Sequence, residues 1–411
     1  MSEREKMRGG MTRREFSVAL GGGLAAAGTA TSLAGASATE AAAGAEGVAA
    51  THEERRRAAR AALQNYHSSA GAKELAPGTI RINFNENPYG PTPKAVAALD
   101  ACGSAAGRYT DHAEHELTET LAGMHGVKAE NVMLGCGSIE VLHVADLVFL
   151  GPGKNVVAAE PTFEAVLGYA QVLQANAVKV PLTADYRHDL PRMAAACTSK
   201  TGVVYVCNPN NPTGTVVTRK EMAEFLAQVP PGTLVVVDEA YHHFVEEPGY
   251  ATSVEFIGAY PNMMVARTFS KIYGLAGMRL GYAVGSKENI ERMKAELLIA
   301  NANAGVLAAA AASLKDQEAL GATRAKLVGT RTWLCGELKK DGRAYIPSQA
   351  NFMMIDMGGD AKPYIAKFEE KKILVGRPFG AMPNYMRVTI GTQEEMVAFV
   401  RTLREIAPVK A

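Results

Sequence analysis

The sequence predicts an α/β protein that combines a large domain, built on a seven-stranded and mostly parallel sheet, with a smaller α+β domain. Apolar runs rich in β-branched residues, such as residues 203–206 (VVYV) and 234–237 (LVVV), are typical of strands buried on both faces of a parallel sheet. Helical patterns separate these runs, which favours alternating strands and helices. We expect the seven strands near Val132, Val156, Val178, Val203, Leu234, Met263 and Leu280.

The chain has 411 residues, of which 47% are hydrophobic and 21% charged, and this length predicts two or three domains. We place the large domain at residues 93–299 and the small domain at residues 300–411, joined by an N-terminal arm at residues 79–92. A long Ala-rich helix over residues 293–314 is expected to connect the two domains. The net charge of +1 offers no general basic field, so we expect neither nucleic acid nor a membrane surface as a partner.

Residues 1–38 have the pattern of a twin-arginine export signal. Arg13 and Arg14 precede an uncharged stretch rich in alanine and glycine, which ends in the small residues Ala36, Ser37 and Ala38. We expect cleavage after Ala38 and a periplasmic or other extracytoplasmic location, with no stable membrane span after cleavage. The alternative is a transmembrane anchor, which would leave an uncleaved chain attached to the membrane.

Residues 39–78 are Ala-rich and then charged, and the run of charges at residues 53–57 (EERRR) opens an expected helix that ends near His67. We interpret this run as a solvated helix face. The five cysteines are an odd number without a Cys-x-x-Cys pair, so neither a disulfide framework nor a zinc site is predicted. The nine histidines show no metal-ligand spacing, and we expect His242 and His243 to shape a pocket wall.

A glycine-rich turn at residues 135–140 (GCGSIE) follows one predicted strand and precedes an apolar-periodic helix. Such a turn presents free backbone N–H groups and the positive end of the helix dipole, which together suit a phosphate. Ser138 is therefore a candidate phosphate ligand, although the same serine could be a plain N-cap.

A second turn, at residues 208–214 (NPNNPTG), follows the predicted strand at residues 203–206. Its two prolines and its glycine fix a rigid turn, and an amide side chain there can donate to a phenolate-like oxygen. An ordinary turn without a ligand remains the alternative. Asp238 and Tyr241 follow the strand at residues 234–237, at the sheet edge where ligands of open α/β sheets bind.

The most informative segment is residues 268–282 (TFSKIYGLAGMRLGY), where Lys271 and Arg279 lie eight residues apart in a glycine-rich turn. A lysine amine can form a Schiff base with an aldehyde, while Ser270 and the guanidinium of Arg279 can hold a phosphate. Pyridoxal 5'-phosphate carries both groups, and a carboxylate such as Asp238 can keep its pyridine nitrogen protonated. We therefore expect this cofactor.

These motifs together resemble those of fold-type I, pyridoxal-phosphate-dependent aminotransferases of class I/II, and most closely the histidinol-phosphate aminotransferase group. The resemblance extends from about Ile82 to Thr392. Its ordered motifs are NENPYGP (85–91), RYTD (108–111), GCGSIE (135–140), PTF (161–163), NPTG (211–214), DEAY (238–241), SK (270–271) and RVTIGT (387–392).

The resemblance implies that Lys271 forms the Schiff base and that Asp238 pairs with the pyridinium nitrogen. The other implied cofactor contacts are Ser138, Ile139, Ser270 and Arg279 at the phosphate, Asn211 and Tyr241 at the ring hydroxyl, and Phe163 stacked on the ring. Without the family context, Phe163 could equally be a core residue. Tyr109 is implied to reach the phosphate of a neighbouring subunit, which predicts a homodimer.

On the substrate side, the resemblance implies that Arg387 binds the α-carboxylate with its planar donors. Considered alone, Arg387 could also be a surface residue on an amphipathic strand. Asn351 is implied to support this carboxylate or its arginine, and Arg377 resembles the arginine that meets the phosphate of histidinol phosphate. Tyr89, in the arm over the pocket mouth, is a further candidate substrate contact.

The predicted reaction is ping-pong transamination between an amino acid, or a histidinol-phosphate-like amine, and a 2-oxo acid. The amine of Lys271, displaced by the donor, moves the Cα proton, and a second 2-oxo acid reverses the sequence. Because the twin-arginine route carries folded proteins, the enzyme could bind its cofactor before transport, so the export signal and the cofactor prediction are consistent. A decarboxylase of an amino-acid phosphate on the same scaffold and a non-catalytic protein that binds an amino acid or the cofactor remain the alternatives.

Overall fold

The computed structural model describes residues 75–298 and 300–408, and its largest sheet has seven strands in the order β2-β8-β7-β6-β5-β3-β4. The strands are β2 (Val132–Gly135), β3 (Asn155–Glu160), β4 (Asn176–Pro181), β5 (Thr201–Cys207), β6 (Leu234–Asp238), β7 (Met263–Thr268) and β8 (Gly281–Gly285). β8 is antiparallel to both of its neighbours, β2 and β7, and the other four neighbouring pairs of this sheet are parallel. The predicted fold class and all seven strands are confirmed.

Alternate residues of the central strands belong to two different hydrophobic cores. In β6, Val235 and Val237 pack in one core, while Leu234 and Val236 pack in the other. Because successive side chains of a strand point to opposite faces, both faces of this sheet are buried. A strand buried on both faces has no polar alternation, which is why its sequence is a continuous apolar run.

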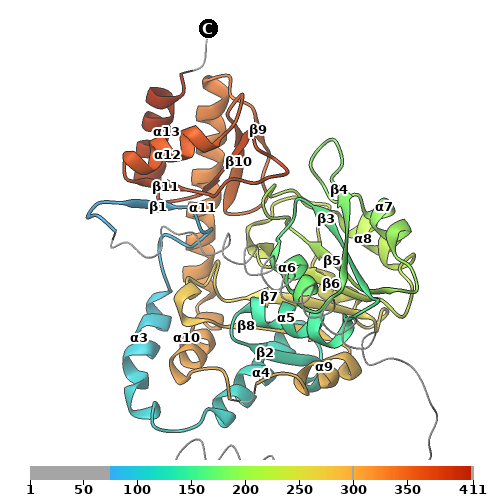
Figure 1. Cartoon of the computed structure of the whole chain (residues 1–411). Coiled ribbons are helices and arrows are strands. Elements are labelled where there is room, and N and C mark those ends of the chain that lie inside the picture. The colour runs from blue at the N-terminus through green and yellow to red at the C-terminus, as the bar shows by residue number, and fades with distance from the viewer. Residues whose placement is uncertain (1–74, 299, 409–411) are drawn as a thin grey trace, which may run out of the picture. The chain divides into compact units, whose positions relative to one another are not determined.

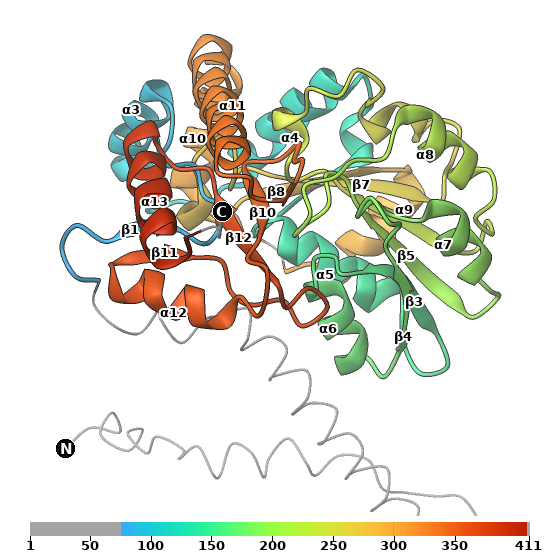
Figure 2. The same cartoon turned by 90° about the horizontal axis from the view of Figure 1, so that it is seen from above.

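Helices cover each face of the sheet (Figure 2). Buried residues of α5 (Ser138–Phe149), α6 (Ala165–Val172) and α9 (Lys287–Lys294) pack in one core. Buried residues of α4 (Asp111–His125), α7 (Leu190–Ala196) and α8 (Arg219–Leu226) pack in the other. This three-layer arrangement is the doubly wound α/β architecture, in which ligands bind at the carboxyl ends of the parallel strands.

The start and the end of the described chain meet in a second set of strands (Figure 1). β1 (Ile80–Ile82) pairs in parallel with β11 (Ile373–Val375). A three-stranded antiparallel sheet has the order β12-β10-β9, and these strands are Tyr385–Thr389, Phe352–Asp356 and Tyr345–Ile346. The helix α12 (Lys362–Glu370) packs against β11, and α13 (Gln393–Ile406) packs against α12. The domain bounds given above remain predictions.

The single helix predicted over residues 293–314 is wrong, because the chain forms two helices there. α9 ends at Lys294, and α10 (Ala304–Leu314) begins only after Asn303, whose side chain accepts a hydrogen bond from the N–H of Val306 as an N-cap. Ala300, between them, has a φ of 53°, a left-handed conformation that no helix contains. The long helix is instead α11 (Gln317–Lys340), and α10 packs against α3 (Pro93–Ala101).

Short 3-10 helices complete the described chain, at Cys102–Ala105, Ala129–Asn131, His242–Phe244, Ser253–Phe256 and Ala276–Met278. Within residues 75–298 and 300–408, no helix is long and apolar enough to cross a membrane. The predicted export signal and most of the Ala-rich and charged segment at residues 39–78 lie outside the described residues.

Candidate active site

A pocket of about 200 Å³ opens at the carboxyl ends of the parallel strands, where several predicted site residues meet. β2, like β7, is antiparallel to β8, so its carboxyl end lies at this same edge of the sheet. Ten of the predicted site residues line the pocket. They are Ser138, Ile139, Phe163, Asn211, Asp238, Tyr241, Ser270, Lys271, Arg279 and Arg387.

Lys271 lies in the loop that leaves β7, and its Nζ donates a hydrogen bond to the carbonyl oxygen of Phe84 over 3.2 Å. The same Nζ lies 5.6 Å from the centroid of the Tyr241 ring. Burial, aided by the charge of Arg387 and opposed by that of Glu86, lowers the pKa of this amine to about 8. A lysine with such a pKa holds a usable fraction of neutral, nucleophilic amine near neutral pH.

Asp238 is the last residue of β6, and its side chain is almost completely buried. Oδ2 accepts a hydrogen bond from the phenol of Tyr205 over 2.9 Å, and Oδ1 accepts one from the N–H of Ala240 over 3.1 Å. Burial raises the pKa of Asp238 to about 6, although these two hydrogen bonds and the charge of Lys271 favour the ionised carboxylate. An ionised carboxylate in this position can form an ion pair with a protonated group of a ligand.

Arg279 forms one side of a cradle for an anion. Its Nη1 donates to Ser270 Oγ over 3.3 Å and to the carbonyl of Ala276 over 2.8 Å. Gly137, with a φ of 81°, is the N-cap of α5, and a Cβ built on it would lie 2.2 Å from Arg279 Nη2. A residue with a side chain at this position would displace the guanidinium from the helix N-terminus. Ser138, the alternative N-cap, is instead the first residue of the helix.

Thr268 orients the serine of this cradle. The hydroxyl of Thr268 donates to Ser270 Oγ over 2.9 Å and accepts from the N–H of Ser270 over 3.0 Å. Because Ser270 Oγ accepts from both Thr268 and Arg279, its own hydrogen can be donated to a ligand. The sequence analysis did not identify Thr268, since a threonine at a strand end carries no signal of its own.

Arg387 lies on β12 and is buried, so the alternative of a surface residue is wrong. Its Nη1 donates to Asn211 Oδ1 over 2.7 Å, and its Nη2 donates to the carbonyl of Asn83 over 2.8 Å. A Cβ on Gly376 would lie only 2.9 Å from Arg387 Cβ, so the glycine allows the arginine strand to approach. Phe163 lines the pocket and also packs against a hydrophobic core.

The N-terminal arm contributes pocket residues that the sequence analysis missed, namely Phe84, Asn85 and Glu86. Asn85 has a φ of 56°, and its Nδ2 donates to the hydroxyl of Tyr241 over 3.1 Å. Its N–H donates to Thr389 Oγ1 over 2.9 Å. Asparagine tolerates the left-handed conformation better than most residues, and the motif NENPYGP (85–91) begins at this position.

Four predicted site residues do not line this pocket: Tyr89, Tyr109, Asn351 and Arg377. The side chain of Asn351 is buried and donates to the carbonyl oxygen of Asn85 over 3.1 Å, so it supports the arm. Tyr109 is 88% exposed, and the ring of Tyr89 lies under the ammonium of Lys326 at 5.0 Å.

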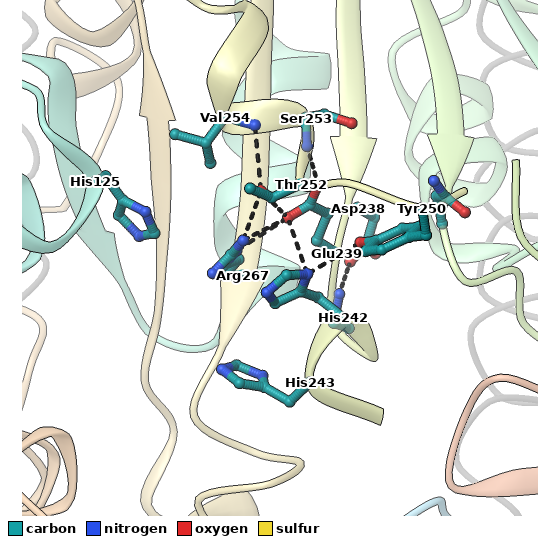
Figure 3. A network of polar contacts seen from close by, with 12 residues as sticks. His125, Asp238, Glu239, His242, His243, Tyr250, Thr252, Ser253, Val254 and Arg267 are labelled. Atoms are coloured by element: carbon teal, nitrogen blue, oxygen red, sulfur yellow. Dashed lines mark hydrogen bonds and ion pairs between the residues drawn. The ribbon is translucent and has the colours of Figure 1, made fainter. Parts of the chain in front are cut away.

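Behind Asp238, a buried network joins Glu239 to Arg267 (Figure 3). Arg267 Nη2 lies 2.7 Å from Glu239 Oε2, which also accepts from Thr252 over 2.9 Å. His242 belongs to this network, with its Nδ1 4.0 Å from Glu239 Oε2, whereas His243 Nε2 lies 3.3 Å from the hydroxyl of Tyr273. Neither histidine lines the pocket, so the expected pocket-wall role is wrong. Burial, aided by the charge of Arg267, lowers the pKa of His242 to about 3, so this ring is neutral.

The donor set of the pocket fits one kind of ligand. The amine of Lys271, whose pKa is lowered, and the buried carboxylate of Asp238 line the same pocket. Arg279, Ser270 and the N-terminus of α5 lie together where they can hold an anion. Pyridoxal 5'-phosphate carries an aldehyde, a basic ring nitrogen and a phosphate, which match these groups. Among residues 75–298 and 300–408, no cluster of three or more His, Cys, Asp or Glu side chains is placed to hold a metal ion.

Comparison with known proteins agrees with this geometry. The pattern of the family "Aminotransferase class I and II" matches residues 77–403. Histidinol-phosphate aminotransferase from Moorella thermoacetica is 41% identical over 347 residues, covering 84% of this chain and 88% of the relative. An aromatic amino acid aminotransferase from Mycobacteroides abscessus is 38% identical over 328 residues, covering 80% of this chain and 93% of the relative.

A solved structure is also similar. Histidinol-phosphate aminotransferase from Sinorhizobium meliloti, in complex with pyridoxal-5'-phosphate, superimposes with a TM-score of 0.75 and 28% identity. The match covers 80% of this chain and 90% of that chain. The residues that match the family pattern, 77–403, include every described strand.

Proposed function

The chain belongs to the class I and II aminotransferases, and we propose how its own residues perform the transamination for which this family is named. The enzyme depends on pyridoxal 5'-phosphate and moves an amino group between an amino donor and a 2-oxo acid. The observation that carries the assignment of roles is that Lys271, Asp238 and the cradle around Arg279 line one pocket.

The cofactor phosphate is held by Arg279, by the hydroxyl of Ser270 and by the N–H groups of Ser138 and Ile139 in the first turn of α5. These N–H groups have no acceptor within their helix, so an anion completes their hydrogen bonding. Asp238 keeps the proton on the ring nitrogen. Asn211 and Tyr241 donate to the ring hydroxyl, and Phe163 covers one face of the ring.

Bound pyridoxal 5'-phosphate supplies an electron sink that stabilises negative charge at the substrate Cα. The neutral amine of Lys271 accepts the proton from the substrate Cα and would deliver it to the aldehyde carbon of the cofactor, and in the second half-reaction it would move a proton in the reverse direction. Arg387 binds the α-carboxylate of the donor in the first half-reaction and that of the 2-oxo acid in the second. Since one arginine serves both substrates, the sequence of events is ping-pong.

We propose an α-amino acid with an aromatic or heteroaromatic side chain as the donor. Phe84, Phe163 and Tyr241 supply aromatic surface around the pocket, which suits a flat side chain. The similarity to an aromatic amino acid aminotransferase supports this choice. Histidinol phosphate is the second candidate donor, because the chain is 41% identical to an enzyme of that name.

The test is a donor screen of the purified enzyme with 2-oxoglutarate as acceptor. The screen contains phenylalanine, tyrosine, histidine, leucine and histidinol phosphate, and the 2-oxo product of each donor is quantified with released carbon dioxide. We expect 2-oxo product from the aromatic donors and none from a Lys271→Ala variant. Carbon dioxide without 2-oxo product would instead support the decarboxylase, and no turnover would support the binding protein.

We also propose that the active unit is a homodimer, in which Tyr109 reaches the cofactor phosphate of the neighbouring subunit. The large exposed fraction of Tyr109, 88%, supports a contact outside its own chain. Mixing Tyr109→Ala subunits with Lys271→Ala subunits tests this idea. Activity should partly return in the mixed dimers, because one of their two pockets keeps both residues, whereas a monomer would regain none.

We propose export by the twin-arginine route, with the support of the pattern at residues 12–38, which lie outside the described residues. Fractionation of cells that produce the full chain would locate the enzyme. Replacing Arg13 and Arg14 by lysine should retain it in the cytoplasm. Equal distribution of the two versions would contradict the proposal.

A further inference from the structure

Two arginines share one aromatic ring at the edge of the pocket. The guanidinium carbon of Arg387 lies 5.3 Å from the centroid of the Phe379 ring, and that of Arg377 lies 4.4 Å from the same centroid. Phe379 is itself buried, so both guanidinium groups lie near one ring inside the protein. Arg387, which is proposed to bind the substrate carboxylate, therefore has a second arginine close by, near the same ring.

The backbone brings these arginines together. The N–H of Gly376 donates to the carbonyl oxygen of Arg387 over 2.8 Å, and Arg377 is the next residue along the chain. A Cβ on Gly376 would lie 3.2 Å from Arg387 Nε and 2.7 Å from its carbonyl oxygen. The glycine before Arg377 thus allows the close approach of the two arginine segments.

The charge of Arg377 is already compensated. Its Nη2 forms an ion pair with Glu164, and its Nη1 donates to the carbonyl oxygen of Pro378 over 3.0 Å. Glu164 precedes α6 and follows Phe163, which lines the pocket. The hydrogen bonds of Arg387 to Asn211 and Asn83, by contrast, go to neutral oxygen atoms.

The ion pair between Glu164 and Arg377 lowers the net positive charge near the position where Arg387 would bind an anionic ligand. Because Glu164 pairs with Arg377, the group around Phe379 carries one positive charge fewer than it would without this carboxylate. Without it, the two arginines would present two positive charges, which match a phosphate dianion better than a carboxylate. A phosphate that approached Arg377 would also meet the carboxylate of Glu164, and like charges repel.

We propose that Glu164 is a specificity-determining residue, which pairs with Arg377 so that the anion subsite selects donors with a carboxylate over donors with a phosphate. This inference rests on the proposed function, since it concerns the substrate class of the same pocket. The alternative is a purely structural link between the segment after β3 and the segment after β11. Such a link would affect all anionic ligands equally.

The test measures binding without turnover. Two ligands without an amino group, 3-phenylpropionate and 2-phenylethylphosphonate, share their aromatic part and differ in their anionic group. Calorimetric titration of the holoenzyme yields the dissociation constant of each ligand. We expect Glu164→Gln to improve the affinity for the phosphonate about tenfold relative to that for the carboxylate. A further Arg377→Gln change should remove this gain.

Glu160→Gln is the matched control. Glu160 lies four residues earlier, its side chain is 42% exposed against 43% for Glu164, and it pairs with Lys179 instead of an arginine beside the pocket. This variant should leave the ratio of the two dissociation constants unchanged. A change in Glu160→Gln as large as that in Glu164→Gln would overturn the proposal, because the effect would then come from any lost surface charge.

The same variants are then compared with histidine and histidinol phosphate as donors, which share an imidazole side chain. The ratio of kcat/KM for histidinol phosphate to that for histidine should rise in Glu164→Gln. An unchanged ratio of dissociation constants would overturn the role of Glu164, even if histidine is converted normally. Absence of 2-oxo product from every donor would instead overturn the proposed function, and the binding result would still decide the role of Glu164.

Discussion

The phenol of Tyr205 donates a hydrogen bond to Oδ2 of Asp238 over 2.9 Å, across the neighbouring strands β5 and β6. Both side chains are buried, so this bond is protected from water. It opposes the effect of burial, which raises the pKa of Asp238 to about 6. Tyr205 therefore helps to keep the carboxylate ionised at neutral pH.

Replacing Tyr205 by phenylalanine should raise the pKa of Asp238, because the ionised carboxylate loses a donor. The affinity of the apoenzyme for pyridoxal 5'-phosphate should fall at low pH, where Asp238 is protonated. We expect this acid limb to move upward by about one pH unit in the variant. Tyr282→Phe, which changes a buried tyrosine away from Asp238, should not move it. If the acid limb of the affinity profile lies at the same pH in both variants, this role of Tyr205 is contradicted.

The rate at which the apoenzyme captures pyridoxal 5'-phosphate should report the pKa of Lys271. The neutral amine is the nucleophile, and its pKa of about 8 leaves the protonated form dominant below that pH. The rate should therefore rise about tenfold per pH unit below pH 8 and become constant above it. Stopped-flow absorbance after mixing measures this rate.

Arg387→Gln provides the check on the sign. The positive charge of Arg387 lowers the pKa of Lys271, so its removal should move the midpoint of the rate profile to higher pH. A midpoint that moves to lower pH, or a rate independent of pH in the unmodified enzyme, would contradict the assignment of the profile to Lys271.

The strands could be predicted because their burial leaves a direct trace in the sequence. A strand such as β5, with all seven residues buried, has a continuous apolar run at residues 203–206, and its turn residues follow soon after. The break between α9 and α10 could not be predicted in this way. The Ala-rich pattern around Ala300 favours helix locally, whereas the N-cap at Asn303 and the tertiary contacts of Asn301 with Glu140 and of Asn303 with Met278 interrupt it.

The candidate site follows the same division. Lys271 and Asp238 could be identified because their chemistry and their positions after apolar runs agree. Tyr205 could not, since a tyrosine inside a strand is expected to be a core residue, and its bond to Asp238 depends on the register of β5 against β6. Glu164 carries no motif of its own either, because its role depends on Arg377, which lies 213 positions later in the chain.

Gly137→Ala should weaken cofactor binding. The new Cβ would lie 2.2 Å from Arg279 Nη2, and the φ of 81° is unfavourable for alanine. The guanidinium must move away from the phosphate position, and a shift of about 1 Å costs on the order of 100-fold in such a site. Equilibrium titration of the apoenzyme with pyridoxal 5'-phosphate measures the loss.

Gly123→Ala is the control for that change, because Gly123 lies in α4 with no atom within 4 Å of the added Cβ. It should bind the cofactor normally. If Gly137→Ala also binds normally, Arg279 does not hold the phosphate from its position in the described structure.

Gly376→Ala should impair the binding of both substrates. The added Cβ would lie 2.9 Å from Arg387 Cβ and 2.7 Å from its carbonyl oxygen, so the arginine must shift. KM should rise on the order of 10- to 100-fold for the amino donor and for the 2-oxo acid alike. Gly380→Ala, four residues later and without a close atom, should change neither value. An increase for the donor alone would show that Arg387 does not serve both half-reactions.

The ion pair of Glu239 with Arg267 should support the sheet edge on which Asp238 lies. In Arg267→Met, the carboxylate of Glu239 stays buried without its cation, which costs about 3–5 kcal/mol in the free energy of unfolding. Arg192→Met removes an exposed arginine whose Nε lies 3.9 Å from Asp189 Oδ2, so it should cost less than about 1 kcal/mol. Urea unfolding compares the two variants. Similar losses in both would contradict a stabilising role of this buried ion pair.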